Sequence, residues 1–421
     1  MPTALPALLR RFSGPKQRRR PSYETSRGEL LETRVLPAAV ASASKTTLTI
    51  TGDAEANDLQ IEQVTGGVKV TALNGTTLTV GGNAVTEATF NGITSLNVRL
   101  GEGDDSVAMI GALNLKNVNI DLGDGDNVLS VGAGATITGK LTINGGTGAD
   151  QVTLDSTVGK TLSLNLNGGN DEVSLLGTSF SSTVSINTGA GADTVTINEN
   201  GLGVDASFNN NVTITTGEDN DTVSISNATT KKLTISTGDD DDTVSLNTVT
   251  VNGLLNVNTS AGADVLNIIN VDATLSGTNQ LSLGTGADDV VIASSSFKGN
   301  VNIDLGTGIV NTLTIDDTDF LGSFSLNANG SVGLNGVGDV INIETDTSLL
   351  GATTFQKTAK LKVGANADIN LGVLNVASDT NFLSSVSISG VNPAADLSVA
   401  LANVSFFSAP ILTKVDRIDL I

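Results

Sequence analysis

The chain has 421 residues, with 47 Gly, a single Tyr, and no Cys, His or Trp. Without His or Cys it cannot build a Ser-His-Asp or Cys-His nucleophile, the usual zinc or haem sites, or a disulfide framework. Aromatic residues make up 3% of the chain. The aromatic platforms on which bases or sugar rings stack are therefore scarce.

Charge divides the chain into two parts. Of the 22 basic and 44 acidic residues, nine basic and three acidic ones fall in 1–45, which leaves 13 and 41 for the rest. The first part thus carries +6 and the second −28. An acidic body disfavours nucleic acid and anionic lipid and favours cations. No apolar run reaches the roughly 18–20 residues that span a bilayer, so we expect no nucleic-acid partner and no membrane span.

Residues 1–45 predict a basic, unfolded N-terminal segment for export. An Arg-rich stretch precedes the apolar residues 35–43, and Ala41-Ser42-Ala43 is similar to an A-x-A cleavage site. Residues 31–38, Leu-Glu-Thr-Arg-Val-Leu-Pro-Ala, resemble the LEPR-XLL segment of large surface or secreted proteins of planctomycete-like bacteria. Thr33 stands where that family has Pro. The resemblance implies a secreted or cell-surface protein.

A repeat dominates residues 46–316. The phrase Gly-x-Gly-x-Asp-x-Val, seen for example at 146–152 and 189–195, returns with a mean spacing of about 23 residues. The recurrent aspartates are Asp105, Asp126, Asp150, Asp171, Asp193, Asp221, Asp242, Asp264 and Asp288.

Alternating apolar and polar residues flank each Gly-rich turn, as in 141–143 before it and 152–154 after it, and this pattern predicts short strands. A period near 23 with strands and no helical pattern predicts an all-β fold, a parallel β-solenoid of roughly 16 coils. Tandem immunoglobulin-like sandwiches would instead repeat at about 100 residues. We expect Val195 to point inward and Thr194 outward.

Two further patterns complete the predicted fold. A Phe stands four residues before the first apolar position of several strands, which predicts an interior stack of rings at Phe180, Phe208, Phe297, Phe320 and Phe382. After about residue 316 the motif weakens and its spacing lengthens. We therefore expect 317–421 to form divergent coils and a C-terminal cap rather than a separate enzymatic domain.

The turns are the candidate site. Stacked coils would place the nine aspartates in one row, about 5 Å apart, where their like charges repel unless a cation binds them. Residues 145–153 match G-G-x-G-x-D-x-U-x and resemble the haemolysin-type calcium-binding repeat. The resemblance implies Ca²⁺ between successive turns, with these aspartates as ligands. The alternative is that each Asp closes an Asx-type turn and keeps the edge solvated, and both interpretations remain open.

Function is predicted by class. We expect an exported structural or adhesive repeat protein without catalysis, with cell-envelope or matrix components as partners and its oligomeric state open. The alternative is a β-solenoid polysaccharide-degrading enzyme, a lyase or hydrolase, whose groove needs paired carboxylates or Ca²⁺ with a basic residue. The only arginines of the body are Arg99 and Arg417, and it contains neither Tyr nor Trp. A flat binder of ice or another surface would need Thr rows, which Gln151, Glu172 and Asp289 interrupt.

Overall fold

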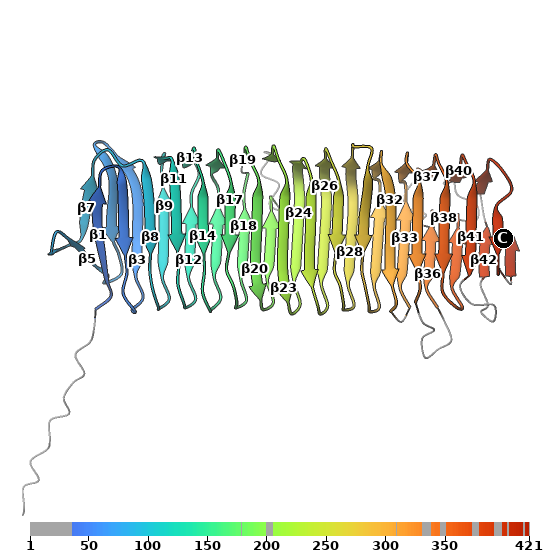
Figure 1. Cartoon of the computed structure of the whole chain (residues 1–421), viewed down its shortest axis with the longest axis horizontal. Coiled ribbons are helices and arrows are strands. Elements are labelled where there is room, and N and C mark those ends of the chain that lie inside the picture. The colour runs from blue at the N-terminus through green and yellow to red at the C-terminus, as the bar shows by residue number, and fades with distance from the viewer. Residues whose placement is uncertain are drawn as a thin grey trace, which may run out of the picture. The chain divides into compact units, whose positions relative to one another are not determined.

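The computed structural model describes residues 36–177, 179–198, 205–308, 310–330, 338–345, 351–372, 379–390, 398–401, 404–415 and 417–420. The chain divides into two units, Met1–Val35 and Leu36–Ile421, and the predicted leader up to residue 35 lies outside the described residues. In the second unit, the body, the regular structure described is all β-strand. Strands of successive coils pair in parallel (Figure 1), which confirms the predicted β-solenoid.

Each coil gives one strand to a first sheet, sheet A, and one long strand, often followed by a short one, to a second sheet, sheet B. Sheet A stacks β8 (Ser95–Arg99), β11 (Asn117–Asp121), β14 (Leu141–Asn144), β17 (Leu162–Asn165), β20 (Val184–Ala190), β23 (Val212–Glu218), β25 (Leu233–Gly238), β27 (Leu255–Asn258), β29 (Thr278–Ser282), β32 (Asn300–Gly306), β35 (Phe324–Ala328), β38 (Ala359–Val363), β41 (Val386–Gly390) and β44 (Ile411–Thr413).

Sheet B follows the Gly-rich turns. Its long strands are β9 (Ser106–Ile110), β12 (Val128–Val131), β15 (Gln151–Leu154), β18 (Glu172–Leu175), β21 (Thr194–Ile197), β24 (Thr222–Thr230), β26 (Thr243–Val251), β28 (Val265–Ala273), β30 (Asp289–Ala293), β33 (Thr312–Asp316), β36 (Val340–Ile343), β39 (Asp368–Leu371), β42 (Ser398–Leu401) and β45 (Arg417–Leu420). Its short strands are β10 (Asn114–Leu115), β13 (Thr136–Ile137), β16 (Thr157–Val158), β19 (Ser179–Phe180), β22 (Ala206–Phe208), β31 (Ser296–Phe297), β34 (Asp319–Phe320), β37 (Ala352–Phe355), β40 (Asp379–Phe382) and β43 (Val404–Phe406).

The N-terminal end of the body is built mainly from antiparallel pairs, although β1 also pairs in parallel with β5. Here β1 pairs with β2, β3 with β4, β4 with β7, and β5 with β6, before β2 and β3 pair in parallel with β8 and β9. These strands are β1 (Ala38–Ser44), β2 (Thr47–Thr51), β3 (Asp58–Val64), β4 (Gly67–Ala72), β5 (Thr77–Val80), β6 (Asn83–Val85) and β7 (Glu87–Phe90). The body therefore begins at Leu36 and not at residue 46. The A-x-A segment lies inside β1.

The coil count is lower than predicted. The period is about 23 residues, and the described part of sheet A stacks 14 strands from β8 to β44, one per coil, rather than the roughly 16 coils predicted. One cause is the antiparallel N-terminal end, which uses its residues in hairpins. The other is the length of later coils: Phe324 of β35 pairs with Ala359 of β38, so that coil takes 35 residues.

The predicted orientation of the strands is confirmed. In β21, Val195 is buried and Thr194 is half-buried on the outer face. Val195 lies in register between Val173 and Val223, so aliphatic side chains stack from coil to coil into one continuous core. Alternation with period two explains this, because successive side chains of a strand point to opposite faces.

The predicted phenylalanine stack is also present. Phe180 stacks on Phe208 with ring centroids 5.2 Å apart, and Phe297 on Phe320 at 5.5 Å. Phe355, which is not among the five rings expected above, stacks on Phe320 at 4.9 Å and on Phe382 at 4.8 Å. The rings form an interior row beside the aliphatic core.

Glycine in the turns is required by close stacking of the backbone. Gly217 and Gly238 have φ of +121° and +110°, and a Cβ on either would lie 1.6 Å from the carbonyl oxygen of the equivalent glycine one coil earlier. A side chain at these positions would therefore clash as well as strain the backbone. This packing holds the turns in one row and aligns the aspartates that follow them.

Candidate functional site: a buried ladder of aspartates

Eight of the nine predicted aspartates form a buried row inside the corner where the Gly-rich turn meets sheet B. Each is at most 2% exposed. We call the row the aspartate ladder; its eight aspartates are Asp105, Asp150, Asp171, Asp193, Asp221, Asp242, Asp264 and Asp288. They are neither solvated nor on an outer edge. The alternative in which the turn aspartates remain solvated along an edge does not hold for these eight.

The ladder is held by hydrogen bonds from coil to coil. The backbone N–H of Asp150 donates to Oδ1 of Asp171 at 2.8 Å, and the N–H of Asp171 donates to Oδ1 of Asp193 at 2.8 Å. The same contact repeats along the row. Each carboxyl thus accepts a backbone N–H of the turn that would otherwise lack an acceptor. These contacts continue the coil-to-coil hydrogen bonding of the parallel strands through the turn.

Asp126 is not part of the ladder. It is exposed, and its Oδ1 accepts the N–H of Ala149 at 2.8 Å. Asn127 is the buried rung in this coil, because it directly precedes β12 as Asp105 directly precedes β9. The Gly-rich phrase places both Asp126 and Asn127 in the turn. Only their sequence position relative to the start of β12 shows which of them is the buried rung.

Three more rungs were missed by sequence reasoning. Asn57 donates its N–H to Asp105, Asn311 accepts the N–H of Asp288, and Asp339 accepts that of Asn311. Ladder residues stand two positions before an inward aliphatic residue, as Asp105 does before Val107. A search for any Asp or Asn at that spacing would have found all three.

The second carboxyl oxygen has no comparable partner. Oδ2 of each of the eight aspartates is buried and without a hydrogen-bond partner within the described ranges. At the Asn127 rung the amide nitrogen Nδ2 stands in place of the second carboxyl oxygen, and it donates to the Gly125 carbonyl at 2.9 Å. At Asn311 the same nitrogen donates to the Leu305 carbonyl at 3.2 Å. The site therefore suits a group that brings a proton or a positive charge.

Burial shifts the ladder carboxyls strongly. It raises the pKa of Asp171 and of Asp242 to about 7, and neighbouring ladder carboxyls add to the rise while hydrogen bonds offset part of it. The same burial raises the pKa of Asp105, Asp150 and Asp221 to about 6. A charged carboxylate in a low-dielectric corner is costly without a partner. These ladder carboxyls therefore take up protons at about pH 6 to 7, well above the usual range of Asp.

A row of buried threonines accompanies part of the ladder. The Thr216 hydroxyl donates to the Thr237 carbonyl at 3.2 Å, and Thr259 donates to Leu283 at 3.2 Å. The hydroxyl of Thr216 also lowers the pKa of Asp221, though less than burial raises it. These hydroxyls therefore offset part of the effect of burial on the pKa of the neighbouring carboxyls.

A second buried carboxyl lies outside the ladder. Glu344, next to β36, is fully buried, and its Oε1 accepts the Asp317 N–H at 2.6 Å and the Thr353 hydroxyl. Its Oε2 has no partner among the residues described. Burial raises its pKa, and Asp316 and Asp317 add to the effect. No motif marks this position in the sequence.

Calcium can be compared with this donor set. Ca²⁺ takes six to eight oxygen ligands, and each aspartate rung offers one unengaged oxygen, Oδ2. In the part of the chain that is described, no three acidic, His or Cys side chains come together as a metal group. Any further ligands would have to be backbone carbonyls of the turns. The oxygen chemistry fits a hard cation, and calcium at the eight buried positions stays a prediction.

Comparison with protein-family models, curated proteins and solved structures finds no match to this chain. Within the ranges that the structure describes, no helix is long and apolar enough to cross a membrane. The fold and the ladder therefore define the protein by geometry: a parallel β-solenoid with an internal row of carboxyl and amide side chains.

Proposed function

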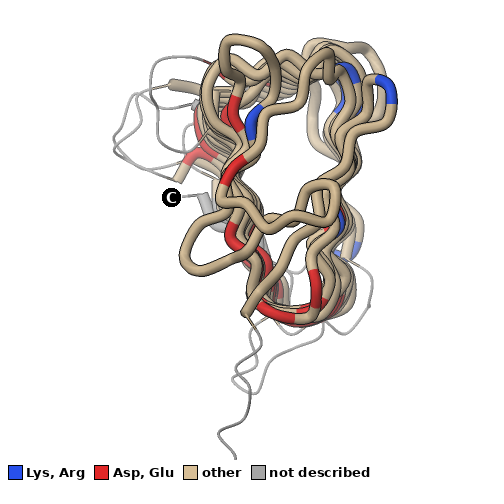
Figure 2. The backbone as a smooth tube through the Cα atoms, turned by 90° about the vertical axis from the view of Figure 1, so that its left-hand side faces the viewer, with Lys and Arg blue, Asp and Glu red and all other residues tan. Residues whose placement is uncertain are grey.

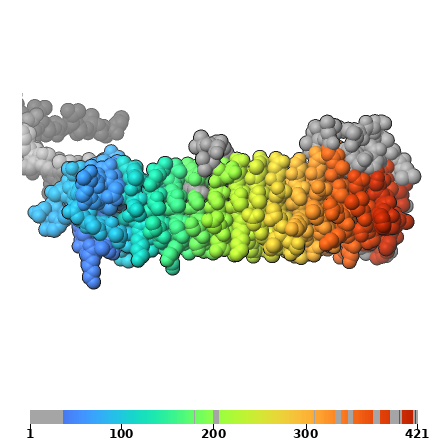
Figure 3. All heavy atoms as spheres, turned by 90° about the horizontal axis from the view of Figure 1, so that it is seen from above, coloured from blue at the N-terminus to red at the C-terminus, as the bar shows by residue number. Residues whose placement is uncertain are grey.

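We propose that this protein is an exported, non-catalytic rod with a structural or adhesive role at the cell surface or outside the cell. The observation that carries the proposal is the continuous core of buried residues from Ala39 to Ile388. The coils around it form an elongated body (Figure 3). A stack of this kind spans distance and presents the same faces many times. The acidic body and the export-like leader are consistent with this role.

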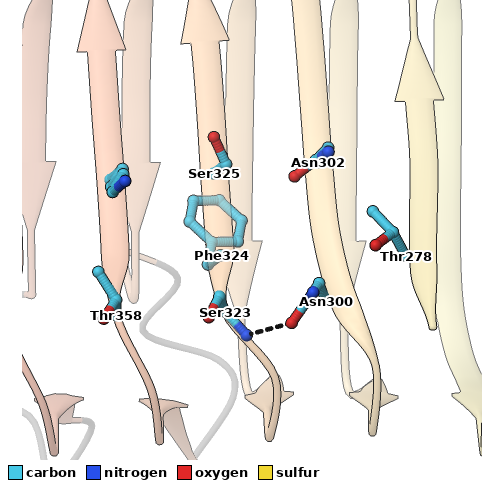
Figure 4. Close-up of a pocket in the computed structure, with 8 residues that line it drawn as sticks. Thr278, Asn300, Asn302, Ser323, Phe324, Ser325 and Thr358 are labelled. Atoms are coloured by element: carbon cyan, nitrogen blue, oxygen red, sulfur yellow. Dashed lines mark hydrogen bonds between the residues drawn. The ribbon is translucent and has the colours of Figure 1, made fainter. Parts of the chain in front are cut away.

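The side chains that line a surface hollow of the body favour a binding or structural role over hydrolysis. One hollow on the outer face of sheet A is lined by Thr278, Asn300, Asn302, Ser325 and Lys360, among others (Figure 4). Its polar groups are hydroxyl, amide and ammonium groups, and the Ser323 N–H donates to Asn300 at 3.0 Å. A glycoside hydrolase needs two carboxyl groups flanking the bond it cleaves. This hollow has none.

Localisation tests the proposal. Surface protease treatment and fractionation of intact producing cells should find the body outside the cytoplasm. A reporter fused to residues 1–45 should be exported, and one fused to 46–80 should not. A protein found in the cytoplasm, or a purified body that cleaves acidic or neutral polysaccharides, would replace this proposal.

A further inference from the structure

The body carries opposite charges along two edges that flank sheet A. The lysine edge consists of Lys116, Lys140 and Lys160, which stand just before β11, β14 and β17 and are all exposed. The ion pairs found within the described ranges involve Lys69 and none of these three. Beside Ser95, Asn119 and Thr142 they line a surface hollow that contains no carboxylate.

The acidic edge lies at the opposite end of the sheet A strands and shares only β11 with the lysine edge. Its exposed members are Glu55, Glu102, Asp104, Asp124 and Asp126, in the turns after β2, β8 and β11. Figure 2, which looks along the body, shows basic residues on one side of the coil outline and acidic ones at its lower corner and on the other side.

The two edges share one axial spacing. Val118, Leu141 and Leu162 pair in register, so the lysines that precede them occur once per coil, about 4.8 Å apart. The backbone of Glu102 forms an isolated parallel β-bridge with that of Asp124 in the next coil, so the acidic residues follow the same spacing. Each edge holds charge on three successive coils. A row of three lysines can therefore face three acidic turns without a change of spacing.

We propose that the lysine edge of one copy docks on the acidic edge of a second copy, with the two rods side by side. This deepens the proposed structural role, and rests on it, by naming the partner as the chain itself. An offset of about two coils, roughly 10 Å, places the turns of Glu55, Glu102 and Asp124 opposite Lys116, Lys140 and Lys160.

The position of the edges decides the form of the assembly. Because they lie at opposite ends of the sheet A strands, one copy uses both edges at once. Such a contact joins two different surfaces and does not close on itself, so it generates an open stack of rods. Opposite edges of one rod thus give an array without a second kind of subunit.

The charge of the whole molecule opposes this contact. Each copy carries −22, but at about 0.15 M salt the Debye length is about 8 Å, so charges farther from the contact are largely screened. The residues that meet at the edges then dominate. A single exposed pair contributes little, and it is the row of pairs that makes the contact selective.

A linear polyanion is the competing occupant of the lysine edge. The second copy is favoured because its complementary row is present on this same chain with the same spacing. The structure contains no equivalent argument for a polymer, so the polymer becomes one outcome of the test.

Sedimentation of the full chain at about 0.1 M NaCl tests the proposal. The wild type should form oligomers that dissociate in 1 M NaCl. Lys116→Glu/Lys140→Glu/Lys160→Glu should stay monomeric, and so should Glu55→Lys/Glu102→Lys, because the two Glu side chains hold no hydrogen bond that the structure shows. Circular dichroism should find both variants folded.

Mixing the two charge-reversed variants is the decisive step. In the first variant both edges are acidic. In the second, two of the five acidic residues of the acidic edge are replaced by Lys, so that this edge complements the reversed edge of the first variant better than a lysine edge, and an equimolar mixture should regain the oligomers. Lys360→Glu/Lys362→Glu, on the outer face of β38, is the matched control and should assemble like the wild type. A wild type that is monomeric at every salt concentration, or variants that assemble unchanged, would overturn the inference. Oligomers that need added poly-L-glutamate would assign the lysine edge to a polyanion instead. A folded monomer that is still found at the cell surface would leave the proposed function intact.

Discussion

Asn127 and Asp150 lie on successive rungs of the aspartate ladder, and Nδ2 of Asn127 donates both to Oδ1 of Asp150 and to the Gly125 carbonyl, at 2.9 Å each. A neutral amide therefore fills a rung and satisfies its surroundings. At the next rung, Oδ2 of Asp150 has no donor within the described part of the chain. The negative charge is thus not needed to hold the turn. It is an added cost that a proton or a cation can remove.

Stability should fall as the pH rises through the titration of the ladder. Burial raises the pKa of Asp171 to about 7 and of Asp288 to about 6, above the ordinary value of 3.8. Between these values the folded state binds more protons than the unfolded chain. The stabilising contribution is therefore complete below about pH 4 and lost above about pH 7, by about 1.4 kcal/mol per pH unit for each proton taken up.

Urea unfolding at constant ionic strength from pH 4 to pH 8 measures this slope. Ordinary salt-bridged carboxylates with lowered pKa values produce the reverse trend, since stability then rises with pH. A flat or rising curve across pH 5–7 would show that the ladder carboxyls are ionised at little cost in the folded state.

Replacing ladder aspartates with asparagine should stabilise the protein at high pH. In Asp150→Asn/Asp171→Asn/Asp193→Asn, each new amide can donate as Asn127 does, and three buried charges disappear. We expect a higher melting temperature at pH 8 and almost no change at pH 4, where the carboxyls are already protonated. The matched control is Glu102→Gln, an exposed change in the turn region that should have little effect at either pH. A loss of stability at pH 8 would mean that the charges are bound and needed.

Melting experiments with added Ca²⁺ test whether the partner of Oδ2 is a proton or a metal ion. We expect millimolar Ca²⁺ at pH 8 to raise the melting temperature more than NaCl of the same ionic strength, by mass action on the folded state. Mg²⁺ should do less, because it gives up its water reluctantly and requires a tighter octahedral site. The effect should shrink at pH 5, where protons compete, and in the triple Asn variant. Coincident curves for Ca²⁺ and NaCl would exclude calcium from the ladder.

The fold could be predicted because the sequence itself repeats with the period of the coils. Alternation in β21 decided which way Val195 points, and the 23-residue repeat decided that coils stack in parallel. The number of coils could not be predicted, since the hairpins of β1–β7 and the 35-residue coil after Phe324 do not follow the mean period.

The burial of the ladder could not be predicted from spacing alone. Spacing places Asp171 in a turn, but whether its side chain turns inward depends on backbone angles set by the stacked glycines. The same limit explains the choice of Asp126 over Asn127, two neighbours in one Gly-rich phrase. Glu344 carries no motif, and its burial follows from contacts with Asp317 and Thr353 that only the folded coils create.

The register of β21 gives the last test. Val195 lies fully buried between Val173 and Val223, so Val195→Asp places a carboxyl in the aliphatic core. An unpaired buried charge costs several kcal/mol, and we expect that loss at pH 8 in urea unfolding. Part of it should return at pH 4, where the new carboxyl can be protonated.

Thr194→Asp, one residue away, is the control. Thr194 faces outward and pairs in register with Glu172, so the change adds one like-charge contact at the surface. This should cost less than about 1 kcal/mol and weaken with salt, while the cost of Val195→Asp should not. Because both changes add the same side chain to the same strand, only its direction differs between them. Equal destabilisation of the two variants would contradict the inward orientation of Val195 in β21, and with it the register that aligns every turn.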